Sequence, residues 1–253
     1  MIRTMFWNEL IIFVLLLLHA YFYAIVENPS SLAWFGGLAQ GTALIFTSVY
    51  IGRVALRARK KEARFYLLLA LGFSICFMAH LLLTYSELIL KKPATGTITD
   101  MIWLIGYALI ARSLVGLLGG VLSKTENIRS HVMMAAITGA IVFTALWIPI
   151  RDPDRTVLVR SIQVIFPFLD LWIAFMALLF AVKTGRRVWL LAASGSLIIG
   201  ITDLIFPYFH TMSSIVYRYL DVPLFIGYSL WWLLGVALRR KTLSSVSQIP
   251  EST

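Results

Sequence analysis

Long apolar stretches, separated by short polar segments, dominate the pattern along the chain. A helix that spans a bilayer needs about 20 predominantly apolar residues. The pattern predicts eight such helices, at about residues 5–26, 33–56, 65–88, 99–122, 132–150, 161–182, 188–209 and 216–238. The linkers between them are short, so the chain is expected to be an all-α polytopic membrane protein.

Composition supports this interpretation. Hydrophobic residues make up 60% of the 253 positions and charged residues only 13%, whereas a soluble domain has about 45–50% apolar and about 25% charged residues. No linker is long enough for a soluble domain. We therefore expect one integral membrane domain over residues 1–240 and a short cytoplasmic tail over residues 241–253.

The net charge of +10 is distributed unevenly. Most lysine and arginine residues fall at the start of the chain, after the second, fourth, sixth and eighth predicted spans, and therefore on one side. An excess of these residues in short loops marks the cytoplasmic face. We expect both termini in the cytoplasm and the protein in the cytoplasmic (inner) membrane. The bilayer is the expected partner of these charges, including its anionic lipids, and no nucleic-acid partner is expected.

Two segments of the chain are nearly the same. "DMIWLIGYAL" begins at Asp100, "DVPLFIGYSL" begins at Asp221, and five of the ten positions are identical. In addition, "RFYLLLALGFSICFMAHLLL" (64–83) aligns with "RVWLLAASGSLIIGITDLIF" (187–206), which places His80 opposite Asp203. The simplest description is an internal repeat of four spans, over about residues 1–123 and 124–240. Such parallel repeats are related by an axis along the membrane normal.

The repeated segment has two interpretations. Asp100 and Asp221 each precede a predicted helix, where an aspartate caps free N–H groups and meets the positive end of the helix dipole. Gly106 and Gly227 allow neighbouring helices to approach closely. Tyr107 and Tyr228 follow them and would direct hydroxyl groups toward a polar interior.

These motifs carry a resemblance. A glycine and then Asp or His in the third span of a repeat, a short loop, and the "D…GY" segment resemble the multi-pass sensory regions at the amino end of some bacterial diguanylate cyclases and histidine kinases. The resemblance covers most of residues 60–123 and 160–240. Those proteins carry a cytoplasmic output domain after the last span, whereas this chain stops at "RRKTLSSVSQIPEST". The resemblance therefore implies a free-standing sensor, or an accessory subunit whose output lies in a partner.

Several ionisable residues fall inside predicted spans, where they are costly and are functional candidates by default. Asp170, Asp203 and His80 lie toward the outer side, and Arg112 lies near the middle of the fourth span. By depth, Asp170 is the best ion-pair partner of Arg112 and Asp203 the next. A structural ion pair and a ligand-binding ion pair both remain open.

Prolines distinguish the second repeat. Pro167, Pro207 and Pro223 lie beside Asp170, Asp203 and Asp221, and the first repeat has no equivalent. A proline in a spanning helix frees a carbonyl group that neighbours or water must satisfy. This predicts a polar cavity in the outer half of the second repeat, with ordinary helix kinking as the alternative. The candidate ligand-binding residues are Asp170, Asp203, Asp221, His80, Arg112 and Tyr228.

Known catalytic and cofactor motifs are missing from the sequence. There is no zinc-protease, nucleophile-elbow or phosphate-loop motif, so no catalytic or metal site is predicted. No lysine lies deep in a span, which excludes a retinal Schiff base. Haem or a lipid remains a candidate cofactor, with His19 and His80 best placed in depth for haem. The only cysteine, Cys76, excludes an intramolecular disulfide.

The sequence therefore favours a non-enzymatic membrane protein. It predicts a sensor of a small or lipophilic ligand, or a subunit of a membrane complex whose partner is another membrane protein or a cytoplasmic output protein. One alternative is an intramembrane lipid-modifying enzyme with His80, Asp170, Asp203 and His210 in its pocket. The other is a transporter or proton pathway that uses Asp170, Asp203 and Arg112.

Overall fold

The protein is all-helical over the residues that its computed structural model describes, which are 2–25, 29–90, 98–151, 155–209 and 219–246. A single-turn 3₁₀-helix, Arg187–Trp189, precedes α8. The α-helices are α1 (Ile2–Ile25), α2 (Pro29–Ala55), α3 (Lys60–Leu88), α4 (Ile98–Gly119), α5 (Lys124–Ala145), α6 (Trp147–Ile150), α7 (Val157–Thr184), α8 (Leu190–Phe209) and α10 (Asp221–Val246). The predicted all-α class is confirmed for this part of the chain, and the arrangement as two four-helix repeats stays a prediction.

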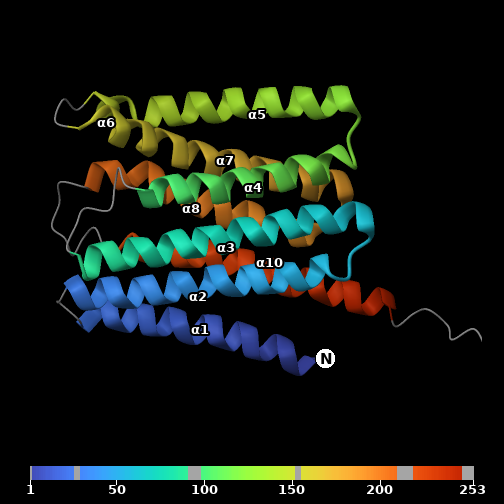
Figure 1. The fold of residues 1–253 in the computed structure, drawn as a ribbon, viewed down its shortest axis with the longest axis horizontal. Coiled ribbons are helices and arrows are strands. Elements are labelled where there is room, and N and C mark those ends of the chain that lie inside the picture. Colours follow the sequence, from blue (N-terminus) through green and yellow to red (C-terminus); the bar gives the residue numbers. More distant parts are fainter. Residues whose placement is uncertain (1, 26–28, 91–97, 152–154, 210–218, 247–253) are drawn as a thin grey trace, which may run out of the picture.

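The long helices lie side by side in one elongated bundle (Figure 1). The most extensive contacts join α2 to α3, α3 to α4, α2 to α10, α7 to α8 and α8 to α10. Helices α1 and α5 lie at opposite margins of the bundle (Figure 1), and each has fewer contacts with its neighbours. We call α1–α4 the first half of the chain and α5–α10 the second half.

Six helices of the described residues are long and apolar enough to cross a membrane, namely α3, α4, α5, α7, α8 with its 3₁₀ turn, and α10. The chain is therefore an integral membrane protein. The first two predicted spans coincide with helices α1 and α2, which do not belong to this set of six. The number of eight spans stays a prediction.

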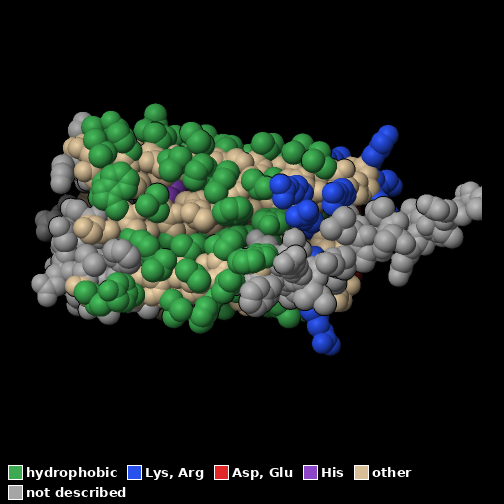
Figure 2. Space-filling view, turned by 90° about the horizontal axis from the view of Figure 1, so that it is seen from below, with side chains coloured by type: hydrophobic (Ala, Val, Ile, Leu, Met, Phe, Trp, Pro, Cys, Tyr) green, Lys and Arg blue, Asp and Glu red, His purple; other side chains and the backbone are tan. Residues whose placement is uncertain are grey.

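The surface of the bundle fits a bilayer. Figure 2 shows a broad band of hydrophobic side chains along the bundle, with lysine and arginine side chains gathered at one end. We call this the basic end. The α2–α3 and α4–α5 connections lie there (Figure 1), and α8 ends and α10 begins at the opposite end. A band of apolar side chains beside a basic end is the distribution expected of a membrane bundle.

Local signals in the sequence set two helix ends at the basic end. The hydroxyl group of Ser123 accepts from the backbone N–H of Glu126, whose carboxylate in turn accepts from the backbone N–H of Ser123. This capping box begins α5. Gly185 ends α7 with a φ of 65°, a left-handed conformation that glycine adopts without strain.

Each half contains a close contact between two helices at a pair of glycines. A Cβ atom at Gly72 would lie 2.9 Å from the carbonyl oxygen of Gly106, and one at Gly195 would lie 2.6 Å from that of Gly227. Only glycine permits these approaches of α3 to α4 and of α8 to α10. The close packing expected at Gly106 and Gly227 is confirmed.

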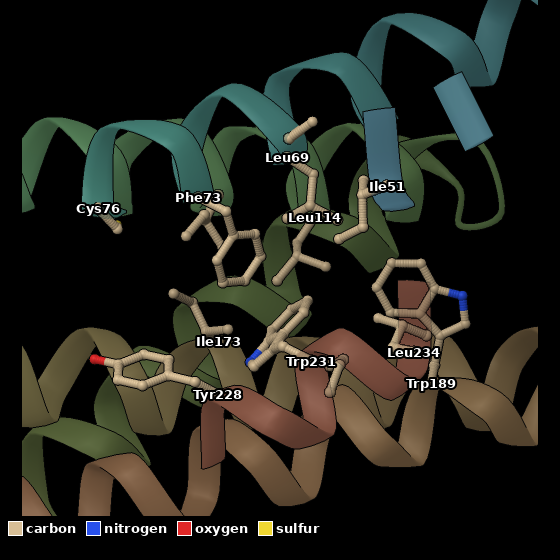
Figure 3. Packing of buried hydrophobic residues seen from close by; sticks show 14 of the residues in the cluster. Ile51, Leu69, Phe73, Cys76, Leu114, Ile173, Trp189, Tyr228, Trp231 and Leu234 are labelled. Atoms are coloured by element: carbon tan, nitrogen blue, oxygen red, sulfur yellow. The ribbon is translucent and has the colours of Figure 1, made fainter. Parts of the chain in front are cut away.

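Between the two halves, toward the basic end, lies an apolar core. Phe73 of α3 and Trp231 of α10 are in contact, with ring centroids 5.0 Å apart, and Leu114, Trp189 and Leu234 are completely buried nearby (Figure 3). This core separates the middle of the bundle from its basic end.

Candidate functional site

The most deeply buried carboxyl group of the described residues belongs to Asp170, in the middle of α7. Asp170 is 2% exposed, and its Oδ1 atom accepts a hydrogen bond of 2.7 Å from the hydroxyl group of Tyr107 on α4. No N–H or O–H group of the described residues donates to its Oδ2 atom. A buried carboxyl oxygen without a donor is costly, so this carboxyl group is a candidate site for a proton or another ligand.

Asp203 of α8 is the acidic neighbour of Asp170. It is partly buried, and its carboxyl group lies within hydrogen-bonding range of that of Asp170. Two carboxyl groups form a hydrogen bond only when one of them carries a proton, because both carboxylate forms are acceptors alone. We call Asp170 and Asp203 the acid pair.

A small cavity lies beside Asp170, where the two halves meet. Its volume, measured for the centre of a water molecule, is about 20 Å³, which is enough for one water molecule. Helices from both halves contribute to its wall. The lining residues are Leu44, Phe73, Cys76, Trp103, Tyr107, Ile110, Asp170, Ile173, Ser196, Ile199, Tyr228 and Trp231.

The position of this cavity corrects the sequence prediction. It does not lie within the second half beside the three prolines, since Leu44, Phe73 and Tyr107 of the first half form part of its wall. None of the prolines lines it. Pro167 and Pro207, which lie inside α7 and α8, therefore do not form its wall, and the cavity lies at the junction between the halves.

Arg112 lies outside this site, which overturns the predicted ion pair. Its side chain is exposed on α4, whereas Asp170 is buried and accepts from Tyr107. Within the described ranges no ion pair joins Arg112 to either member of the acid pair. Depth along a helix was the only basis of the prediction, and the face of α4 that carries Arg112 points away from the core.

Asp221 also lies outside the cavity. Its Oδ1 atom accepts a hydrogen bond of 3.1 Å from Nε2 of Gln40 on α2, and a Cβ atom at Gly36 would lie 2.8 Å from its Oδ2 atom. Asp221 thus holds the first turn of α10 against α2. Asp221 therefore does not line this cavity together with Asp170.

His80 occupies the position in α3 that aligns with Asp203, but its interactions differ. It is 5% exposed, its Nε2 atom is 2.8 Å from the carbonyl oxygen of Gly37 on α2, and its ring packs edge-on against Trp103. His80 therefore interacts with the backbone of α2. The side chain of His19 and all of His210 lie outside the described residues, and with them lie the candidate haem pair and part of the candidate enzyme pocket.

Tyr228 is the predicted residue that lies in the cavity wall together with Asp170. Its ring stacks on that of Trp103 at 6.4 Å. Sequence reasoning missed the buried hydrogen bond of 3.0 Å from Trp231 Nε1 to the hydroxyl group of Ser196, because a Trp and a Ser in apolar spans carry no motif. It also missed Cys76 as a lining residue. Its alignment with Ile199, another lining residue, was the available signal.

A polar network lies between the acid pair and the end of the bundle opposite the basic end. Arg155 donates to the carbonyl oxygen of Pro207 at 2.9 Å and to Oε1 of Gln163 at 2.8 Å. Pro207 is one helical turn beyond Asp203 on α8. Polar groups therefore continue from Asp203 toward this end, whereas the apolar core fills the bundle in the other direction.

Comparisons of the chain with protein-family models, with curated protein sequences and with solved structures gave no match. Function is therefore argued from the site.

Proposed function

We propose that this protein is a non-enzymatic sensor in the inner membrane, in which the acid pair binds a ligand and changes the packing of the two halves. In this proposal the chain crosses the membrane eight times as two four-helix repeats, and the basic end with both termini faces the cytoplasm. The glycine contacts Gly72–Gly106 and Gly195–Gly227 support the repeat, and the basic end supports the orientation.

The observation that carries the proposal is the acid pair at the junction of the halves, in which Asp170 is buried and Asp203 partly buried. Its side chains come from α7 and α8, and its hydrogen-bond donor comes from α4. A ligand that changes the charge of this pair therefore acts on helices of both halves. Ionisable groups buried in a bilayer are costly to maintain and mark functional sites.

The polar groups on one side of the acid pair favour a sensor over a transporter. Arg155, Gln163 and the carbonyl group of Pro207 continue from Asp203 toward the end opposite the basic end. On the other side, Leu114, Trp189 and Leu234 are completely buried in the apolar core. A transporter has to open a path to both sides, whereas a sensor needs access from one side only.

A partner that carries the output completes the proposal. The basic end is the natural place for it, because the proposed orientation puts that end in the cytoplasm. The partner is a cytoplasmic output protein or another membrane protein. If the two proteins stay bound permanently, this chain is an accessory subunit of a membrane complex.

Cysteine labelling with a membrane-impermeant thiol reagent tests the access, in a Cys76→Ala background. We expect Leu204→Cys, beside Asp203, to react only from outside. Leu114→Cys, in the apolar core, should react from neither side. Leu56→Cys, 87% exposed at the basic end, should react only from inside and serves as the control. Labelling of Leu114→Cys or Leu204→Cys from both sides would instead indicate a transport path.

Hydrogen exchange tests whether a change at the acid pair alters the structure at the basic end. Asp203→Asn should change the exchange rate of the α7–α8 connection over residues 184–187 at the basic end, because it changes the charge state of the acid pair. Asp100→Asn, in the first turn of α4 outside the cavity wall, is the matched control and should leave that rate unchanged. Equal exchange rates in the wild type, Asp203→Asn and Asp100→Asn would contradict the proposed sensor.

A further inference from the structure

The acid pair has an unusual charge balance. In the described residues no lysine, arginine or histidine forms an ion pair with Asp170 or Asp203, and the wall of the cavity contains no basic side chain. Two neighbouring carboxylates inside the bundle repel each other, and burial removes much of the solvation that water provides. A positive ligand is therefore required if both groups are to stay in this position.

The geometry points to a proton as that ligand: Asp170 and Asp203 share one proton, which exchanges with the aqueous phase at the end of the bundle opposite the basic end. This inference rests on the proposed function, since it names the ligand of the same site.

The size of the cavity favours a proton over larger cations. About 20 Å³ holds one water molecule, so an organic cation or a lipophilic ligand has no space in this arrangement of helices. A metal ion is disfavoured by the ligand set. In the described residues no three His, Cys, Asp or Glu side chains are placed so that they could hold a metal ion together, and hard cations need several oxygen ligands. A proton needs only the two carboxyl groups.

The surroundings of the pair leave few competing groups. The titratable groups nearest the pair are Tyr107 of α4, which packs against α7, and two residues of the cavity wall, Tyr228 of α10 and Cys76 of α3. On another face of α7, the ring of His131 of α5 packs against Trp172. Toward the end of the bundle, the nearest described cation along the polar network is Arg155, which donates to the carbonyl group of Pro207.

Loss of the proton has a mechanical consequence. It leaves two negative charges between α7 and α8, which then repel each other. These helices touch closely at this level, because a Cβ atom at Gly200 would lie 3.1 Å from the Cβ atom of Asp170. Repulsion between the two carboxylates therefore pushes apart two closely packed helices. This changes the packing along the whole contact of α7 with α8.

Infrared difference spectroscopy tests the proton directly. The purified protein in lipid nanodiscs is titrated from about pH 5 to about pH 9, a range in which buried carboxyl groups titrate. A protonated carboxyl group has its own C=O stretching band, which shifts in heavy water. We expect the wild type to lose one such band as the pH rises. Asp170→Asn and Asp203→Asn should each move the pH at which this loss occurs, because the remaining carboxyl group no longer faces a second acidic group. The control Asp100→Asn should leave that pH unchanged.

The alternatives give different results. A band that titrates identically in the wild type and in both acid-pair variants would overturn the proton site. The titration is repeated with sodium chloride in place of potassium chloride. If sodium shifts the titration of the wild type but not that of Asp170→Asn, the site binds sodium instead. If one variant does not fold, the other gives the same decision. If the band titrates as expected while the 184–187 connection keeps its hydrogen-exchange rate, the proton site stands and the proposed sensor fails.

Discussion

The two halves of the chain share a packing contact but differ in the chemistry beside it. In the first half, Gly72 packs on Gly106, and His80 of the same helix interacts with the carbonyl oxygen of Gly37. In the second half the corresponding contact joins α8 to α10, but an aspartate replaces the histidine.

That replacement changes what the neighbouring helix has to provide. His80 is satisfied by a backbone carbonyl group of α2 within its own half. Asp203 faces a second carboxyl group, that of Asp170, and the only hydrogen bond that the described residues donate to Asp170 comes from Tyr107 in the other half. The hydrogen bonds of His80 thus lie within the first half, whereas Asp170 in the second half accepts from a donor in the first half. The proposed function is located where the halves differ.

The largest effect is expected at the shared contact. Gly72→Ala and Gly195→Ala each place a Cβ atom less than 3.0 Å from the backbone of the opposite helix. Both should lower the free energy of unfolding by roughly 1–3 kcal/mol. The two losses should be similar if the two contacts contribute equally to stability. Reversible unfolding in mixed micelles measures this.

Gly52→Ala provides the matched control for that comparison. A Cβ atom at Gly52 has its nearest neighbour at 3.8 Å, which is an ordinary contact. Alanine is favoured over glycine in a helix by about 1 kcal/mol, so this variant should be neutral or more stable. A large loss at only one of Gly72 and Gly195 would mean that the halves are not built alike.

The next effect concerns the donor that crosses between the halves. Tyr107→Phe removes the hydroxyl group that donates to Asp170 and should cost about 0.5–1.5 kcal/mol, the usual net contribution of a hydrogen bond. Tyr228 occupies the corresponding position in the second half. No hydrogen bond from its hydroxyl group is found among the described residues, so Tyr228→Phe should cost less in the same unfolding assay. A larger loss of stability for Tyr228→Phe than for Tyr107→Phe would mean that the more important hydrogen-bond donor lies in the second half, which contradicts this expectation.

The helices and the glycine contacts were predictable because both depend on local rules. Apolar length predicts a spanning helix, and a glycine repeated in aligned segments predicts a close approach. The partners of charged groups were not predictable in this way. Depth along the chain placed Arg112 near Asp170, but the direction of a side chain depends on which face of its helix meets the core, and the apolar residues around Arg112 gave no clear amphipathic pattern. Asp221 was misplaced for the same reason, since its contact with Gln40 depends on α2 and α10 being neighbours.

The smallest effect is expected at Arg112, although the sequence predicted a buried ion pair there. A buried ion pair with Asp170 would make Arg112→Leu lose about 3–5 kcal/mol, because it leaves a buried charge unpaired. The side chain is instead exposed on α4. Leu233 lies at the corresponding position of α10, at the same offset that relates Asp100 to Asp221. The substitution therefore gives the first half the residue of the second. We expect the free energy of unfolding to change by no more than about 0.5 kcal/mol, as for other surface substitutions. The infrared titration of the acid pair should also be unchanged. A loss of several kcal/mol that Asp170→Leu restores would return Arg112 to the core and remove the need for a proton between the two carboxyl groups.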